Sequence, residues 1–167
     1  MGIWQRFFGR ERDEARFQPL YRAIVAEARR PEWYTGAGVP DTLDGRFDMI
    51  ALVLSLVLIR LEREGPSGRE DAVLLTELFI ADMDGQVREI GFGDLVVGKQ
   101  VGRMVGALGG RLTAYRGSDR REALLRNLYR GVEPTPSQLR ACEAMVGALE
   151  AGLAVVPVDA LLAGRLT

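Results

Sequence analysis

Histidine is absent from the 167-residue chain, and cysteine occurs once, at Cys142. Without histidine the chain lacks the commonest general base and the commonest metal ligand. A single cysteine forms neither an intrachain disulfide nor a cysteine-cluster zinc site, and such usage is typical of a reducing compartment. We therefore assign no catalytic, cofactor-binding or metal-binding residue, and we expect a protein that is not an enzyme and needs no cofactor.

Long hydrophobic runs and a strong net charge are lacking as well. The longest uncharged apolar run, residues 49–59, covers eleven positions, whereas a membrane-spanning helix needs roughly 20. The net charge of −1 gives no general attraction to nucleic acid. The first residues do not resemble a cleavable signal peptide. These observations predict a soluble, cytoplasmic protein that does not bind nucleic acid.

The alternation of apolar and polar residues that marks a half-buried strand is also missing, and apolar residues recur at helical spacing instead. The apolar run 49–59 is the one segment for which a strand is the rival interpretation, and its length and Leu and Ala content favour a helix. Helices are expected over 17–30, 42–64, 69–90, 94–115, 118–130 and 136–152, with a short turn over 159–163. The prediction is an all-α, single-domain bundle of about six or seven helices over 17–167, preceded by an arm, 1–16.

Capping residues mark the helix starts. Asp41 or Thr42 is suited to cap the second helix, Asp94 and Ser118 to cap the fourth and fifth, and Thr135 to cap the last long helix. Pro136 then takes the first helical position. Residues 31–42 contain Gly and Pro breakers and are expected to form a loop.

The stretch GFGDLVVGKQ contains Gly93, Gly98 and Lys99 at the spacing of a phosphate-binding P-loop. Gln100 stands where the Ser or Thr of that motif binds magnesium, and the preceding segment has helical rather than strand periodicity. We therefore interpret the stretch as a helix–helix turn without nucleotide binding.

Two polar residues, Asp82 and Gln86, fall within the apolar stripe of the helix expected over 69–90. A carboxylate there must be paired, solvated or used on a partner, and the first expectation is an internal pair with an Arg or with Lys99. Asp84 and Arg88 are four residues apart, which predicts a surface ion pair along the helix.

Glycine recurs every four residues at Gly98, Gly102 and Gly106, followed by Gly109 and Gly110. Each glycine inside a helix costs about 1 kcal/mol relative to alanine, so close packing against another helix is expected to offset the loss. The favoured partner is a neighbouring helix of the same bundle. The alternative is a transmembrane helix of a client protein, since strips of small residues suit such contacts.

The amino-terminal sequence MGIWQRFFGR places Trp4, Phe7 and Phe8 beside Arg6 and Arg10. Aromatic and basic residues in this arrangement are typical of a short interfacial membrane anchor. An arm folded onto the domain explains the same residues equally well, and both interpretations stay open.

Two longer blocks resemble a known family. VPDTLDGRFD and FIADMDGQVREIGFGDLVVGK are similar to the motifs of the ubiquinol–cytochrome c chaperone family of mitochondria and α-proteobacteria, and the resemblance runs from about residue 21 to 129. Gly102 and Gly106 are not part of the pattern. The first block contributes Asp41, Asp44, Gly45, Arg46 and Asp48, and the second Asp82, Asp84, Arg88, Glu89, Gly91, Asp94, Gly98 and Lys99.

The resemblance implies a non-enzymatic assembly factor that holds newly made cytochrome b until it enters the bc1 complex. It implies partner-binding roles for the charged residues of the two blocks and a location at the cytoplasmic face of the inner membrane, with peripheral membrane contact. Mitochondrial members work with a small partner protein at the ribosome. The alternatives are a general adaptor at the membrane surface and an enzyme acting on a haem or quinone intermediate.

Overall fold

The computed structural model describes the backbone of residues 3–89, 91 and 93–167, and the side chains of residues 15–89, 91, 93 and 96–167. These residues form helices and contain no β-strand, so the prediction of an all-α bundle is confirmed. In chain order the helices are α1 (Ile3–Ala28), α2 (Pro31–Thr35), α3 (Leu43–Glu62), α4 (Pro66–Glu89), α5 (Asp94–Arg116), α6 (Arg120–Leu124), the π-helical turn η1 (Leu125–Tyr129), α7 (Pro136–Val155) and α8 (Val158–Leu162).

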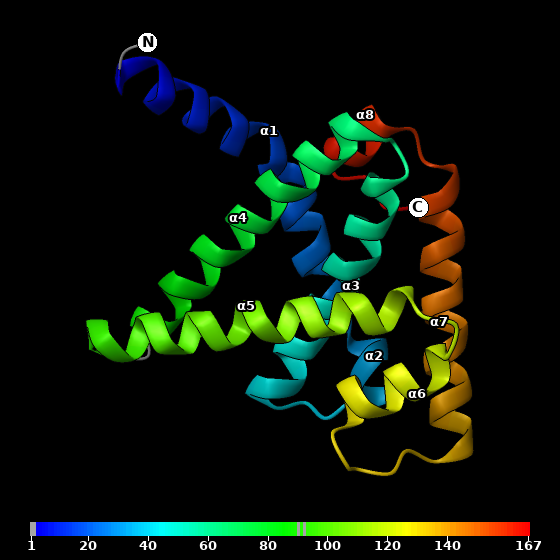
Figure 1. Ribbon diagram of the computed structural model, residues 1–167. Helices are drawn as coiled ribbons and strands as arrows, with labels where there is room; N and C mark the ends of the chain where they lie inside the picture. The colour runs from blue at the N-terminus through cyan, green and yellow to red at the C-terminus, as the bar shows by residue number, and fades with distance from the viewer. Residues whose placement is uncertain (1–2, 90, 92) are drawn as a thin grey trace.

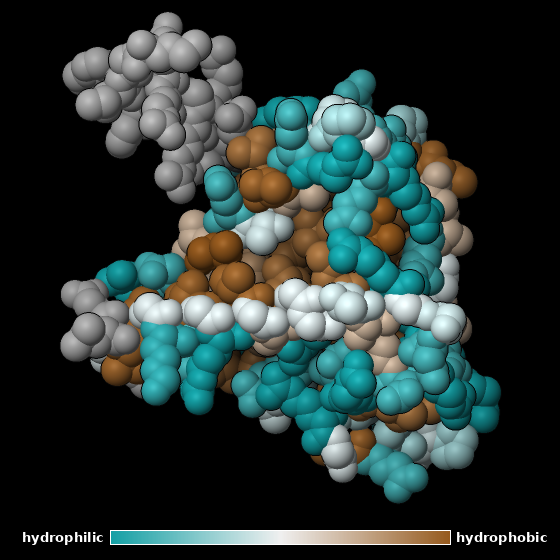
Figure 2. Space-filling model, in the orientation of Figure 1, coloured by the Kyte–Doolittle hydropathy of each residue, from teal (hydrophilic) through white to brown (hydrophobic). Residues whose placement is uncertain are grey.

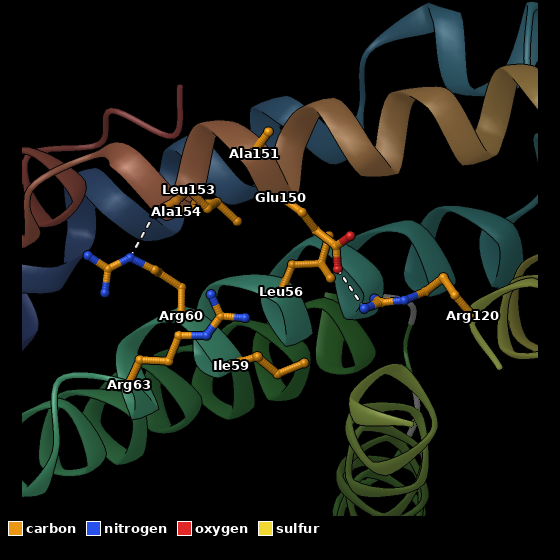
Figure 3. A pocket seen from close by; sticks show the side chains of 9 residues that line it. All are labelled: Leu56, Ile59, Arg60, Arg63, Arg120, Glu150, Ala151, Leu153 and Ala154. Carbon is orange, nitrogen blue, oxygen red and sulfur yellow. Dashed lines mark hydrogen bonds and ion pairs between the residues drawn. The ribbon is translucent and has the colours of Figure 1, made fainter. Parts of the chain in front are cut away.

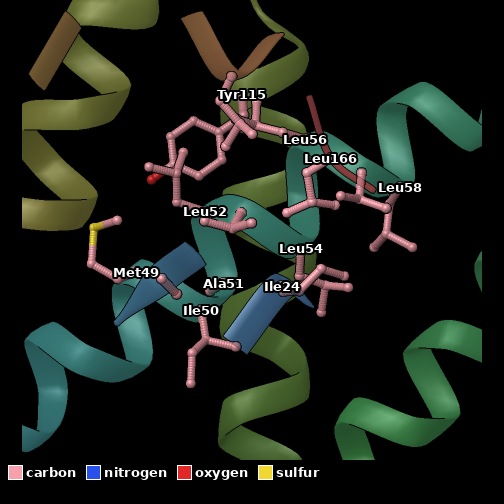
Figure 4. Close-up of a cluster of buried hydrophobic side chains, with 14 of the residues drawn as sticks. Ile24, Met49, Ile50, Ala51, Leu52, Leu54, Leu56, Leu58, Tyr115 and Leu166 are labelled. Atoms are coloured by element: carbon pink, nitrogen blue, oxygen red, sulfur yellow. The ribbon is translucent and has the colours of Figure 1, made fainter. Parts of the chain in front are cut away.

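Helix α3 is the centre of the bundle. It packs against α1, α4, α5, α7 and η1, and its residues 48–58 are all buried. Figure 4 shows side chains of this segment among Ile24 of α1, Tyr115 of α5 and Leu166 near the carboxyl terminus. A helix that is apolar on every side is stable only when neighbours cover it all round, which is why the run 49–59 forms the core helix and not a strand.

The other helices are arranged around α3. Figure 1 shows α5 crossing the front of the molecule, α4 descending to the amino-terminal end of α5, and α7 along the opposite side. Helix α8 returns the chain to α1. The bundle thus places the start of α3, the end of α4 and the first turns of α5 at one end of the molecule.

Two of the expected caps are confirmed. The Thr42 hydroxyl accepts a hydrogen bond from the Gly45 amide at 3.0 Å, so Thr42 and not Asp41 caps α3. Thr135 caps α7 and forms a reciprocal capping box with Gln138, and Pro136 is the first helical residue. Such caps satisfy amide groups that have no partner within the helix.

Two other caps were predicted wrongly. Gly93, not Asp94, is the cap of α5, because Gly93 has the extended backbone of a cap and Asp94 is already helical. Asp119, not Ser118, caps α6, because its carboxylate accepts from the Glu122 amide at 2.9 Å.

The predicted helix bounds also need correction at four places. Helix α4 begins at Pro66, three residues before the expected start at 69. Helix α1 begins at Ile3 and not at residue 17. The prediction placed its start too late because the first turns of α1 lack the apolar stripe from which helix starts were inferred. The expected loop after it contains the short helix α2, which Pro31 starts and buried Trp33 holds, its indole N–H donating to the Glu27 carbonyl at 3.0 Å. The expected single helix 118–130 is divided into α6 and the π-helical turn η1. None of the helices that the structure describes has the length and apolar composition needed to cross a membrane.

Candidate functional site

The first motif block surrounds a buried carboxylate at the start of α3. Asp48 has no exposed surface, and its Oδ1 accepts hydrogen bonds from the guanidinium groups of Arg111 and, at 2.9 Å, Arg130. Arg130 also lies 3.1 Å from Asp44. Because a buried charge is costly unless it is paired, this network fixes α5 and the residue after η1 against α3.

The network also constrains the backbone. Arg130 adopts the left-handed conformation, with φ 45° and ψ 43°, which is uncommon for a residue other than glycine. Burial raises the pKa of the Asp48 carboxyl, and Arg130 and Arg111 act in the opposite direction.

Sequence reasoning selected Asp48 but missed both arginines. For Arg111 a signal existed, since it lies next to the apolar stripe of α5 at Leu112.

The exposed members of the first block lie on the surface above Asp48. Arg46 donates from Nε to Asp41 Oδ1 at 2.7 Å, and this hydrogen bond holds the pKa of the Asp41 carboxyl below its usual value. The Asp44 side chain is 73% exposed. Gly45 is required between them, because a Cβ there would lie 1.9 Å from the Pro40 carbonyl oxygen. The first block therefore presents an accessible charged turn held rigidly on the bundle.

Asp82 of the second block is paired inside the molecule. Its Oδ2 accepts from the Tyr21 hydroxyl at 2.7 Å and from Gln86 Nε2 at 2.9 Å. The expectation of an internal pair is confirmed, but the expected partner, an Arg or Lys99, was wrong. Burial, together with the hydrogen bond to Asp82, raises the pKa of Tyr21. Asp82 thus joins α4 to α1.

The remaining members of the second block lie around the turn between α4 and α5. The predicted ion pair is confirmed, with Arg88 Nε 2.6 Å from Asp84 Oδ2. Glu89 and Lys99 are exposed. The side chain of Asp94 lies outside the described residues. These positions form a charged surface at the end of α4, adjacent on the fold to the first block at the start of α3.

Between the two blocks lies a groove of about 560 Å³, bounded by α3, α4 and α5. We call it the α3–α5 groove. It is lined by apolar side chains below and by polar and charged side chains at its edge. Of the predicted partner-binding residues only Asp44 and Arg46 line it. The other lining residues are Arg29, Leu43, Phe47, Ile50, Met83, Gln86, Val87, Gln100, Arg103, Met104, Ala107 and Arg130.

The glycine strip of α5 has no neighbour in the described part of the chain. A Cβ built at Gly98, Gly102, Gly106, Gly109 or Gly110 meets no atom within 4 Å, and all five glycines are exposed. The expected packing against a helix of the same bundle is therefore wrong. In Figure 2, α5 crosses the molecule as a pale band, and hydrophobic side chains line a hollow between α4 and α5 directly above it.

A second pocket, of about 370 Å³, lies between α3, α7 and the start of α6 (Figure 3). Two of its three arginines form contacts within the chain. Arg60 donates to the carbonyls of Leu153 at 2.8 Å and Val156 at 3.2 Å, which the end of α7 leaves without helical partners. Arg120 pairs with Glu150 at 2.6 Å. We therefore assign this pocket to the stability of the bundle.

The amino-terminal aromatic residues belong to α1 by their backbone. The side chains of Trp4, Phe7 and Phe8 lie outside the described residues. Their role as a membrane-interface anchor, and the separation of residues 1–16 from the domain, stay predictions.

The site thus combines a rigid charged surface with two faces open to a ligand, the α3–α5 groove and the glycine strip. This is the construction of a protein that binds another macromolecule. The sequence profile of the ubiquinol–cytochrome c chaperone family matches residues 35–167, and the chain belongs to this family. A comparison with curated proteins finds no match.

A solved structure is similar over almost the whole chain. The crystal structure of the Cbp3 homolog from Brucella abortus superposes with a TM-score of 0.76 at 31% sequence identity, covering 98% of this chain and 94% of that one. The likeness includes α1, which precedes the part matched by the family profile.

Proposed function

We propose that the protein is a non-enzymatic chaperone that binds unassembled cytochrome b and thereby supports assembly of the bc1 complex. Membership of the ubiquinol–cytochrome c chaperone family supports the role in assembly. The observation that carries the choice of an apolar membrane subunit as client is the uncovered glycine strip of α5, with a hydrophobic hollow beside it.

The glycine strip is suited to a helix as ligand. Each glycine costs about 1 kcal/mol relative to alanine, and no contact within the described chain offsets that cost. A small-residue strip allows a second helix to approach closely, as in membrane-protein interfaces. A transmembrane helix of the client, docked along α5, buries its own apolar side chains in the hollow. Its packing against the glycines offsets their cost in helix stability.

The charged surface of the two motif blocks contacts the polar loops of the client, a small partner protein or the ribosome. The accessible residues proposed for these contacts are Asp41, Asp44, Arg46, Asp84, Arg88, Glu89 and Lys99. Asp94, whose side chain lies outside the described residues, is proposed with them from the motif. Asp48 and Asp82 act indirectly, since their carboxylates bind Arg111, Arg130 and Tyr21.

Binding only the unassembled client stabilises that state by mass action until other subunits displace the chaperone. The proposed place of action is the cytoplasmic face of the inner membrane. Trp4, Phe7 and Phe8 would provide peripheral contact with the lipid surface there.

Gene deletion in the native host tests this function. Assembled bc1 complex and haem-stained cytochrome b should fall while cytochrome b transcript is unchanged, because unshielded apolar helices are exposed to aggregation and proteolysis. The wild-type gene should restore both. Normal cytochrome b in the deletion strain contradicts the proposal, and normal cytochrome b with loss of another membrane protein favours a general adaptor.

A further inference from the structure

From the lining of the α3–α5 groove we infer a second docking site, for an amphipathic helical segment of another protein whose apolar face is flanked by Asp or Glu. The groove and the glycine strip use different sides of α5. Gln100, Arg103, Met104 and Ala107 line the groove. At about 100° per residue, Gln100, Met104 and Ala107 lie on a different side of α5 from the glycines, and Arg103 lies at the border between the two faces. The inference is therefore independent of the identity of the client bound at the strip.

The floor of the groove is apolar and adaptable. Ile50, Met83 and Val87 are at most 4% exposed and form its base, and Phe47 and Met104 pack partly buried against the core. Methionine side chains fit differently shaped partners. A volume of about 560 Å³ lies within the range of ligand pockets and accepts several side chains of a docked helix.

The edge of the groove carries one unusual apolar residue. Leu43, the first residue of α3, is 71% exposed and lies at the mouth of the groove. An exposed leucine beside an apolar groove extends the surface that a partner can bury. A ligand that only fills the floor leaves Leu43 in water, whereas a helix lying across the groove covers it.

The charge at the edge determines the chemistry of the partner. The lining of the groove contains four arginines, Arg29, Arg46, Arg103 and Arg130, but only one carboxylate, Asp44, although the whole chain has a net charge of −1. Arg130 is neutralised by Asp44 and Asp48, and Arg46 by Asp41.

Two of these arginines are available to a ligand. Among the described residues no carboxylate lies within 4 Å of Arg29 or Arg103, and Arg103 donates only to the Gln100 amide oxygen at 3.2 Å. Guanidinium groups pair strongly with carboxylates. The partner therefore carries negative charge beside its apolar face.

A helix meets this arrangement better than a lipid does. The four arginines come from the residue after α1, from α3, from α5 and from the residue after η1, so separate parts of the chain bring them to the groove. A lipid headgroup brings its charge to one place, whereas a helix laid in a groove presents apolar anchors along one stripe and carboxylates on its flanks.

Fluorescence anisotropy with synthetic helical peptides tests the inference. The probe carries Leu at i, i+3, i+4 and i+7 with Glu on both flanks. One control replaces Glu by Lys, and another replaces Leu by Ser. The full-length protein should bind the probe and neither control peptide. Its affinity for the probe should fall as the salt concentration rises, because exposed charge pairs are screened.

A matched pair of double variants locates the binding. The double variant Arg29→Glu, Arg103→Glu should bind the probe with at least tenfold lower affinity. Arg69→Glu with Arg140→Glu makes the same change of net charge at exposed positions outside the groove and should leave binding unchanged. Ala107→Trp, which fills the groove without changing charge, should also weaken binding, and circular dichroism shows that each variant remains helical.

Three results overturn the inference: equal binding of the Lys-flanked peptide, equal loss in both double variants, or binding of phosphatidylglycerol vesicles through Arg29 and Arg103 without binding of the probe. The third result assigns the groove to lipid. Co-purification of cytochrome b with the Arg29→Glu, Arg103→Glu protein tests the two proposals separately. Loss of peptide binding at the groove should leave docking of cytochrome b at the glycine strip intact.

Discussion

Asp48 illustrates what a single residue contributes and how far the sequence reveals it. Its place in a charged motif identified it as important, but its partners are 63 and 82 residues away along the chain. No local spacing predicts such contacts, because they depend on how α5 and η1 pack against α3. The pair Asp84–Arg88 was predicted correctly because the spacing of four residues within one helix fixes it.

Replacing Asp48 by Asn should destabilise the fold strongly. The substitution leaves Arg111 and Arg130 without their buried counter-charge, and breaking a buried pair in this way costs about 3–5 kcal/mol. Chemical denaturation measures the free energy of unfolding. Asp41→Asn, at an exposed pair with Arg46, is the control and should change stability little. Equal effects of the two substitutions would contradict the structural role of Asp48.

Cys142 should be unreactive in the folded protein. The side chain is fully buried, and burial raises its pKa to about 11, so the thiol stays protonated at pH 8. The thiolate is the nucleophile. Iodoacetamide at pH 8 should label the protein rapidly only after unfolding in denaturant, as followed by mass spectrometry. Fast labelling under native conditions would show that the environment of Cys142 is open.

At the scale of single helices, the sequence predicted what depends on local chemistry. Thr135 formed the expected cap of α7, and the apolar run of α3 formed the expected buried helix. The glycines of α5 were misinterpreted, because their spacing indicates close packing without saying which chain provides the neighbour. The π-helical turn η1 after α6 packs against α3, and the periodicity of the sequence did not predict it.

Alanine in the glycine strip should stabilise the isolated protein. Gly102→Ala and Gly106→Ala place a methyl group in open space and should each raise the free energy of unfolding by about 1 kcal/mol. Gly147→Ala is the matched control on α7, where a Cβ also meets nothing within 4 Å. Gly45→Ala should destabilise, since its Cβ meets the Pro40 carbonyl oxygen. Loss of stability at 102 or 106 in thermal or chemical denaturation would reveal an internal neighbour.

At the scale of the whole molecule, residues 48–58 of α3 are covered on all sides, while α5 is left with two accessible faces. The all-α class and the family could be predicted from periodicity and from the two motif blocks. The open faces could not, because exposure depends on the positions of helices that are distant in the sequence. Tyr21 and Asp82 show the same limit, since their contact requires α1 to lie against the end of α4.

The amino-terminal arm belongs to this scale because it relates the molecule to a membrane. Deleting residues 2–10 should leave the bundle folded, since buried side chains of α1 include Phe17, Leu20 and Ile24, beyond the deletion. Sedimentation with anionic liposomes should decrease if Trp4, Phe7 and Phe8 insert at the interface. Unchanged sedimentation would favour an arm folded onto the domain.

Affinity purification from a membrane-competent host tests whether the glycine face of α5 holds unassembled cytochrome b. Quantitative mass spectrometry should find cytochrome b enriched with the wild-type protein and with Gly147→Leu. It should be depleted at least tenfold with Gly102→Leu and Gly106→Leu combined, because the added side chains block the close approach of a helix. Absence of cytochrome b from the wild-type sample, or equal recovery with all variants, would show that the glycine face of α5 does not hold cytochrome b.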